Sequence, residues 1–163
     1  MNELKTNKQR YWIALFLEDM DVGQAFEPSR LHVTIIPWFV SDLTEVELIN
    51  SFNSEFNSIK KFEIIISEIA HFGPDHDVTV NLVEPEPNIM QLHQQALAWF
   101  ERIRHRWAVA RPHVNEDYRP HVRRRPGSEL NQGEIININN LYLIAADRVE
   151  NNSRRVAAKL PLL

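Results

Sequence analysis

Two segments, residues 31–37 and 118–125, each place a histidine within an alternating pattern of apolar and polar side chains. If both segments are β-strands, successive side chains point to opposite faces of a sheet. His32 and Thr34 then share one face of the first strand, roughly 6.6 Å apart at Cα, because a strand rises about 3.3 Å per residue. The alternating apolar side chains share the opposite face and predict a core there: Leu31, Val33 and Ile35.

The second segment repeats this arrangement, with Val122 on the apolar face and His121 and Arg123 on the other. Two imidazoles suit acid and base catalysis, since one can take a proton from a nucleophile while the other gives a proton to a leaving oxygen. A hydroxyl and a guanidinium beside them can hold phosphate oxygens. The pattern therefore predicts a phosphoryl-transfer site in which His32 and His121 are catalytic and Thr34 and Arg123 bind phosphate.

The composition limits the classes of protein that the chain can belong to. Its 44% hydrophobic and 25% charged residues are typical of a globular protein, and 163 residues fit a single domain over residues 1–163. The net charge of −4 does not indicate a protein that coats nucleic acid, and the lack of cysteine excludes disulfides and a cysteine nucleophile. No run approaches the ~18 apolar residues of a membrane span, so we expect a cytoplasmic protein, with a monomer as the starting assumption.

Hydrophobic patterning predicts the other strands. The continuous apolar run at residues 11–17 is typical of a central strand buried on both faces, and residues 18–30 are expected to form a loop. Pro37 is expected to end the first histidine strand or to lie on an edge. Four further segments resemble strands, the first two as a hairpin and the last as an edge strand: residues 62–70, 78–82, 135–146 and 151–163.

Helical spacing is present in two segments. Asp42, followed three residues later by Glu45, is expected to cap a helix of about four turns with apolar residues between Val46 and Ile59. Asn88 is expected to cap a second helix. Its predicted apolar stripe comprises Ile89, Leu92, Ala96, Trp99 or Phe100, Ile103 and Trp107. Three histidines without partners are expected on the helix surface or in loops: His93, His105 and His113.

Helices flanked by strands predict an α+β fold. We expect a bilobal molecule, with two pseudo-symmetric lobes that each pack a helix on an antiparallel sheet, and with a central cleft between them. Each lobe would contribute one histidine strand.

In these features the chain resembles the 2H phosphoesterase superfamily, whose best-known branch contains 2′-5′ RNA ligases and cyclic phosphodiesterases. The resemblance extends from the opening apolar strand through His32-Val33-Thr34, His71-Phe72-Gly73 and Arg119-Pro120-His121-Val122 to Leu141-Tyr142-Leu143. It implies a metal-independent phosphoesterase without cofactors that acts on 2′,3′-cyclic phosphates or 2′-5′ phosphodiesters of RNA ends or nucleotides. It also implies that His32 and His121 form the acid/base pair.

One position departs from the family pattern, because Arg123 stands where the second motif has Thr or Ser. A guanidinium can bind phosphate bidentately, but it is larger than a hydroxyl. The alternative is therefore a non-catalytic protein that binds a nucleotide or an RNA end on the same fold.

Other residues offer weaker candidates for function. Arginines gather near the second motif, and we expect a role for Arg123 and for one of Arg124 and Arg125. Those at 102, 104 and 106 are expected on a solvated helix face, and the group also includes Arg111 and Arg119. A metal site at His71, Asp75, His76 and Asp77 is the third alternative, although a surface turn explains these residues better. Three aromatic residues flank the motifs and could stack on a base or pack in the core: Trp38, Phe39 and Tyr118.

Overall fold

The computed structural model describes residues 9–26, 30–110, 112–146 and 153–163. Its first half contains β1 (Arg10–Phe16), β2 (Ala25–Phe26), β3 (His32–Val40), α1 (Glu45–Phe56), β4 (Phe62–Phe72) and β5 (Val78–Val83). Its second half contains α2 (Pro87–Ile103), β6 (Arg106–Trp107), a 3₁₀ turn η2 (Asn115–Asp117), β7 (His121–Arg123), β8 (Ile135–Ile138), β9 (Asn140–Ala146) and β10 (Arg154–Pro161).

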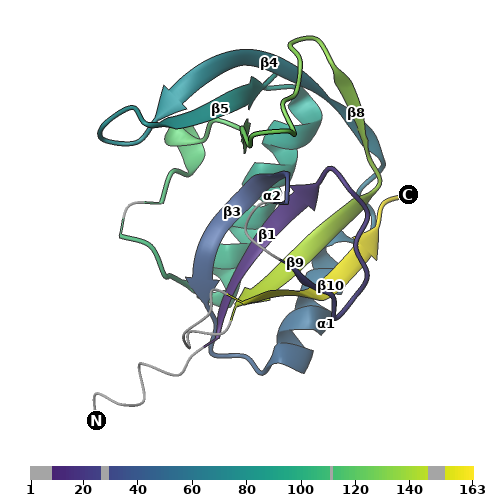
Figure 1. Cartoon of the computed structure of the whole chain (residues 1–163). Coiled ribbons are helices and arrows are strands. Elements are labelled where there is room, and N and C mark those ends of the chain that lie inside the picture. Colours follow the sequence, from purple (N-terminus) through teal and green to yellow (C-terminus); the bar gives the residue numbers. More distant parts are fainter. Residues whose placement is uncertain (1–8, 27–29, 111, 147–152) are drawn as a thin grey trace.

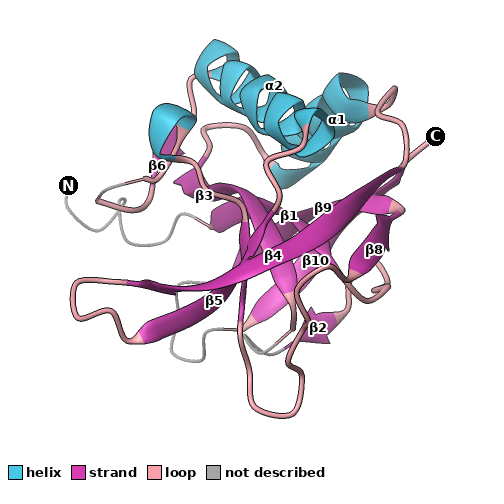
Figure 2. Ribbon diagram, turned by 90° about the horizontal axis from the view of Figure 1, so that it is seen from above, coloured by secondary structure: helices cyan, strands magenta, loops and turns pink. Residues whose placement is uncertain are grey.

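These strands form one curved sheet in the described part of the chain, in the order β2-β10-β9-β1-β3-β7-β5-β4-β8, with β6 paired to β3 (Figure 1). The neighbouring strands pair in antiparallel fashion. Both helices cover the same face of the sheet (Figure 2), and the rings of Phe56 and Trp99 join the two helices at a centroid distance of 5.8 Å. The predicted α+β class is confirmed, whereas the division into two pseudo-symmetric lobes stays a prediction.

Strand β1 lies in the centre of the sheet and is buried on both faces, as its sequence predicts. Tyr11, Ile13 and Leu15 face the helices and join the main core. Trp12 and Phe16 lie on the opposite face, in a second apolar cluster with Met20, Tyr142, Ile144 and Val156. This second cluster lies on the sheet face that also carries the polar side chains of β3.

Strand β3 follows the predicted alternation at its start, because Val33 and Ile35 belong to the main core and His32 and Thr34 do not. The prediction that Pro37 ends this strand is wrong. Pairing with β1 shifts between Tyr11 and Ile13, so that two residues of β3, Pro37 and Trp38, oppose one residue of β1. Such a bulge accommodates a proline, which cannot donate a ladder hydrogen bond, and the strand continues to Val40.

Both helices begin at other residues than the sequence predicts. Thr44, not Asp42, caps α1: its hydroxyl accepts from the Glu47 backbone N–H, and the Glu47 carboxylate accepts from the Thr44 N–H. Glu86, not Asn88, precedes α2, because Pro87 occupies the first helical position, where its missing N–H has no cost. The buried face of α1 is Leu48, Phe52 and Phe56, so Val46 is 68% exposed.

Several strand boundaries also differ from the predictions. Residues 135–146 form two strands, because β8 pairs with β4 whereas β9 pairs with β1 and β10. The expected loop at 18–30 contains the two-residue strand β2. Trp107 lies in β6 rather than on α2, which ends at Ile103. The hairpin of β4 and β5 and the C-terminal strand β10 are confirmed. Residues 151 and 152 of that predicted strand lie outside the described residues.

Candidate functional site

The two histidine segments are neighbouring strands of the sheet. Strand β3 pairs with β7 through Val33 and Val122, and both valines point into the main core. In this antiparallel register His32 stands opposite Arg123 and Thr34 stands opposite His121, on the face away from the helices. The two histidines are diagonal neighbours, for which Cβ atoms are typically ~7–8 Å apart or somewhat less. A space thus remains between the two imidazoles.

Each histidine ring is held by the backbone in the same way. Nδ1 of His32 lies 2.8 Å from the Arg30 carbonyl oxygen, and Nδ1 of His121 lies 2.8 Å from the Arg119 carbonyl oxygen. A carbonyl oxygen only accepts, so Nδ1 carries the proton in both rings. In the neutral ring, Nε2 is then left as the basic nitrogen.

Aromatic side chains support the two imidazoles. The His32 ring stacks on Trp12 at 5.3 Å and 23°, and it also contacts Phe16 at 5.3 Å. The His121 ring meets the edge of Phe72 at 4.7 Å. Because these contacts restrict both rings, their positions are set before any ligand binds.

Burial shifts the proton equilibria of both histidines in the same direction. It lowers the pKa of His32 to about 4, and the positive charges of Arg154 and Arg125 and the neighbouring His121 add to this effect. Burial also lowers the pKa of His121, with further contributions from Arg119 and His113. Since a bound anion would favour the charged forms, ligand binding and protonation of the pair are coupled.

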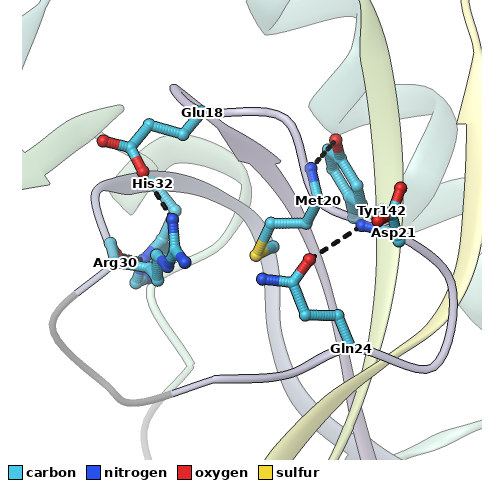
Figure 3. A network of polar contacts seen from close by, with 7 residues as sticks. All are labelled: Glu18, Met20, Asp21, Gln24, Arg30, His32 and Tyr142. Atoms are coloured by element: carbon cyan, nitrogen blue, oxygen red, sulfur yellow. Dashed lines mark hydrogen bonds and ion pairs between the residues drawn. The ribbon is translucent and has the colours of Figure 1, made fainter.

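All four predicted site residues line one pocket of about 280 Å³. Its other walls are Trp12, Leu31, Pro37 and Trp38, together with three further arginines: Arg30, Arg125 and Arg154. No carboxylate is among the described side chains that line it. Arg30 pairs with Glu18 beside His32 (Figure 3). The pocket is therefore electropositive and suited to an anionic ligand.

A second cavity, of about 530 Å³, adjoins this pocket. The two share Thr34, Pro37 and His121. The further walls of the second cavity are largely apolar and include Phe72, Val109, Pro112 and Tyr118. A ligand whose phosphate lies near His121 can therefore extend into a wider, less polar space.

Two residues outside the predicted set hold Thr34 in place. The Tyr118 hydroxyl donates to the Thr34 carbonyl oxygen at 2.8 Å, and the Tyr118 ring stacks on His93 at 3.8 Å and 8°. His93 is fully buried and donates through Nδ1 to the Ile35 carbonyl oxygen, while its Nε2 accepts from the Asn115 N–H. Its predicted surface position is wrong, although its spacing of four from Ile89 could have placed it on the apolar stripe.

The predictions about the other histidines and the aromatic residues are partly confirmed and partly wrong. His105 is 6% exposed and stacks on Phe39 at 4.8 Å, so its predicted surface position is also wrong, whereas His113 is exposed in a loop. Trp38 lines the pocket and the largely buried Tyr118 lines the second cavity, whereas Phe39 is a buried core residue. In the described ranges, no group of three or more His, Asp or Glu side chains could hold a metal ion, at the 71–77 turn or elsewhere.

The arginines near the second motif do not act as one group. Arg102 and Arg106 are exposed and pair with Glu55 and Asp42, so their predicted exposure is confirmed, but Arg106 lies in β6 and not on the helix. Arg124 instead donates to the Asn81 side chain and to the Leu130 carbonyl oxygen, which is a structural role. Of the pair 124 and 125, only Arg125 lines the pocket. Arg111 lies outside the described residues.

Sequence reasoning missed three pocket residues: Trp12, Arg30 and Arg154. No local pattern marks Trp12 and Arg154, because the pairing of distant strands brings β1 and β10 to the pocket. Arg30 directly precedes the first histidine segment, in the stretch that the sequence predicts as a loop.

Comparison with known proteins identifies the family. A family model described as the 2′-5′ RNA ligase superfamily matches residues 16–123, a stretch that includes the whole first histidine segment and the second as far as Arg123. The chain belongs to the 2′-5′ RNA ligase superfamily. The family resemblance drawn from the two motifs is thereby confirmed. No curated protein matches the chain in sequence.

Solved structures confirm the fold of the superfamily. E. coli LigT complexed with 3′-AMP superposes with a TM-score of 0.63 at 13% identity, covering 95% of this chain and 98% of LigT. TT0787 of Thermus thermophilus gives a TM-score of 0.61 at 14% identity, covering 94% of this chain and 97% of TT0787. LigT complexed with NADP+ gives a TM-score of 0.62 at 13% identity, covering 95% and 98% of the two chains. In the described residues no helix is long and apolar enough to cross a membrane.

Proposed function

We propose that this protein is a metal-independent phosphoesterase that acts on 2′,3′-cyclic phosphates or 2′-5′ phosphodiesters of RNA ends or nucleotides. The observation that carries the proposal is the diagonal pair His32 and His121. Both rings hold Nδ1–H against a backbone carbonyl oxygen, which leaves Nε2 for chemistry in an electropositive pocket. Membership of the 2′-5′ RNA ligase superfamily supports the same class of reaction.

The proposed reaction divides the proton transfers between the two histidines. Neutral His32 takes the proton of the attacking water or ribose hydroxyl at Nε2 as its oxygen bonds to phosphorus. Protonated His121 gives its Nε2 proton to the leaving oxygen as the old P–O bond breaks. His32 is assigned as the base because burial and the nearby arginines lower its pKa to about 4, which keeps its imidazole neutral at neutral pH.

The remaining site residues bind the substrate in this proposal. The Thr34 hydroxyl and the Arg123 guanidinium donate to the non-bridging phosphate oxygens, where charge develops during the reaction. The leaving nucleoside lies in the second cavity, because His121 and Thr34 line both spaces. The LigT structures with 3′-AMP, NADP+ and ATP support a nucleotide as the class of ligand.

The experiment is hydrolysis of nucleoside 2′,3′-cyclic phosphates and short 2′-5′ oligonucleotides in EDTA, by the wild type and by His32→Ala and His121→Ala. We expect turnover that resists the chelator and falls by about 10²–10⁴-fold in each variant. Gln91→Ala, at an exposed position on α2, is the control. Binding without turnover by the wild type would instead favour the non-catalytic binding protein, and turnover abolished by EDTA would contradict the two-histidine mechanism.

A further inference from the structure

The pocket has two chemically different sides. Arg125 and Arg154 line the first pocket but not the second cavity, whereas Arg119 and His113 line the second cavity but not the first pocket. The second cavity adjoins the His121 side. The His32 side therefore carries an additional concentration of positive charge that the reacting phosphate, already served by Thr34 and Arg123 in the proposed function, does not require.

Arg154 is the centre of this charge. Its guanidinium lies 4.6 Å from the centre of the Trp12 ring and 5.4 Å from that of Trp38, so two indoles fix its position. Burial lowers the pKa of Arg154, and the like charges of Arg10 and Arg125 lower it further. Among the described residues, no carboxylate forms an ion pair with Arg154.

The second observation concerns Trp12, which is 3% exposed and lines the same pocket. Its indole Nε1 is a buried donor that has no hydrogen-bond partner in the described part of the protein. A buried donor without a partner costs free energy. The Trp12 ring contacts the Arg154 guanidinium and lines the pocket together with Arg154 and Arg125, so two guanidinium groups and this indole contribute to the same pocket wall.

We propose that Arg154 and Arg125, beside the Trp12 indole, form a second anion subsite, which binds a phosphate of the substrate other than the reacting one. The substrate class is then a nucleotide or RNA end that carries a terminal phosphate in addition to its cyclic or 2′-linked phosphodiester. This inference rests on the proposed function for the position of the reacting phosphate. The stacked Trp12 ring connects the two sites, because it contacts both His32 and Arg154.

The test compares two ligands that differ by one phosphate, adenosine 2′-monophosphate and adenosine 2′,5′-bisphosphate, by isothermal titration calorimetry. We expect the wild type to bind the bisphosphate at least about tenfold more tightly, the scale of one or two hydrogen bonds to a charged group. In Arg154→Gln this preference should fall to about twofold or less. Arg104→Gln, which removes a positive charge from the exposed end of α2, should retain it.

The measured quantity is the ratio of the two affinities within each variant. Misfolding would weaken the binding of both ligands and leave this ratio unchanged, whereas loss of the subsite would lower it. Arg125→Gln gives a second variant in which the preference should also decrease. Equal affinities in the wild type, no measurable binding of either ligand, or a preference unchanged in Arg154→Gln would overturn the inference. Turnover of a 2′,3′-cyclic phosphate without any bisphosphate preference would overturn the inference alone, whereas a preference without turnover would overturn only the proposed function.

Discussion

His32 and His121 are anchored identically: in each, Nδ1 lies 2.8 Å from the carbonyl oxygen two residues earlier in the chain. Their electrostatic surroundings nevertheless differ, because Arg154 of β10 and Arg125, which follows β7, act on His32. Two rings with equal geometry and unequal surroundings are what an acid and a base require, since the two roles need opposite protonation states.

The first prediction concerns the pH dependence of kcat/KM. Both histidines have a lowered pKa in the free protein, so both are increasingly neutral above pH ~6.5, the ordinary value for histidine. Because the acid must be protonated, we expect a bell-shaped profile with its maximum below about pH 6.5 and a decline of up to tenfold per pH unit above it. Initial rates from about pH 3.5 to 9 cover both limbs of this profile, because the acid limb depends on His32, whose pKa is about 4.

The profile of kcat should be displaced to higher pH than that of kcat/KM, because a bound phosphate anion stabilises the imidazolium form. Thermal denaturation at each pH provides the control for loss of folded protein. A maximum of kcat/KM above pH 8 would contradict the assignment of these two residues as acid and base.

The second prediction concerns Arg123, which lines the pocket and forms no ion pair with any carboxylate in the described ranges. If it binds phosphate, Arg123→Ala should lower kcat/KM about tenfold or more, because a hydrogen bond to a charged group is lost. Arg123→Lys should recover only part of the loss, since an ammonium lacks the bidentate geometry.

Arg123→Thr separates this role from the binding-protein alternative. The threonine restores the hydroxyl of the family motif, so a scaffold inactive only because of Arg123 should gain turnover. An enzyme that uses the guanidinium should instead lose activity in Arg123→Thr. Steady-state kinetics with a 2′,3′-cyclic phosphate distinguishes the two outcomes.

The sequence was sufficient for the parts of the site that depend on local alternation. His32 and Thr34 could be placed on one strand face because Val33 and Ile35 mark the other. His121 and Arg123 could be placed in the same way, because Val122 marks the opposite face of its strand. The pairing of Val33 with Val122 could not be predicted, because no local signal specifies which distant strands are neighbours. The arginine on β10 was missed for the same reason.

The ends of the helices and the positions of individual histidines show a second limit of prediction from the sequence. Asp42 and Thr44 are both good capping residues, and only the position of the buried face of α1 decides between them. His93 was misplaced because histidine is polar, although its helical position belongs to the apolar stripe. Here tertiary hydrogen bonds to Ile35 and Asn115 outweigh the usual preference for the surface.

The third prediction tests the buried face of α1. Phe52 is fully buried whereas Val46 is 68% exposed on the same helix. Phe52→Ala should lower the free energy of unfolding by about 3–5 kcal/mol through lost burial and cavity formation. Val46→Ala is the matched control and should change it by less than about 0.5 kcal/mol. Urea denaturation measures both, and a large effect at Val46 would contradict this orientation of the helix.

The fourth prediction concerns the stability of the fold in acid. Burial lowers the pKa of His105 to about 4, although the Asp42 carboxylate acts in the opposite direction. Its Nε2 has no hydrogen-bond partner among the described residues, and its ring lies against Phe39, Trp99 and Phe100. Between pH ~6.5 and about 4 the unfolded chain binds more protons at this residue than the folded protein does. The free energy of unfolding should therefore decrease as the pH falls through this window.

His105→Phe removes the titrating ring and keeps an aromatic side chain in its place. We expect its free energy of unfolding to fall less than that of the wild type between pH 6.5 and 5, by about 1 kcal/mol. His32 and His93, whose pKa values are also lowered by burial, keep part of the acid sensitivity in this variant. Urea denaturation at both pH values gives the difference, with the exposed His113→Gln as the control. An equal loss of stability in His105→Phe and in the wild type would show that His105 becomes protonated equally well in the folded and unfolded states.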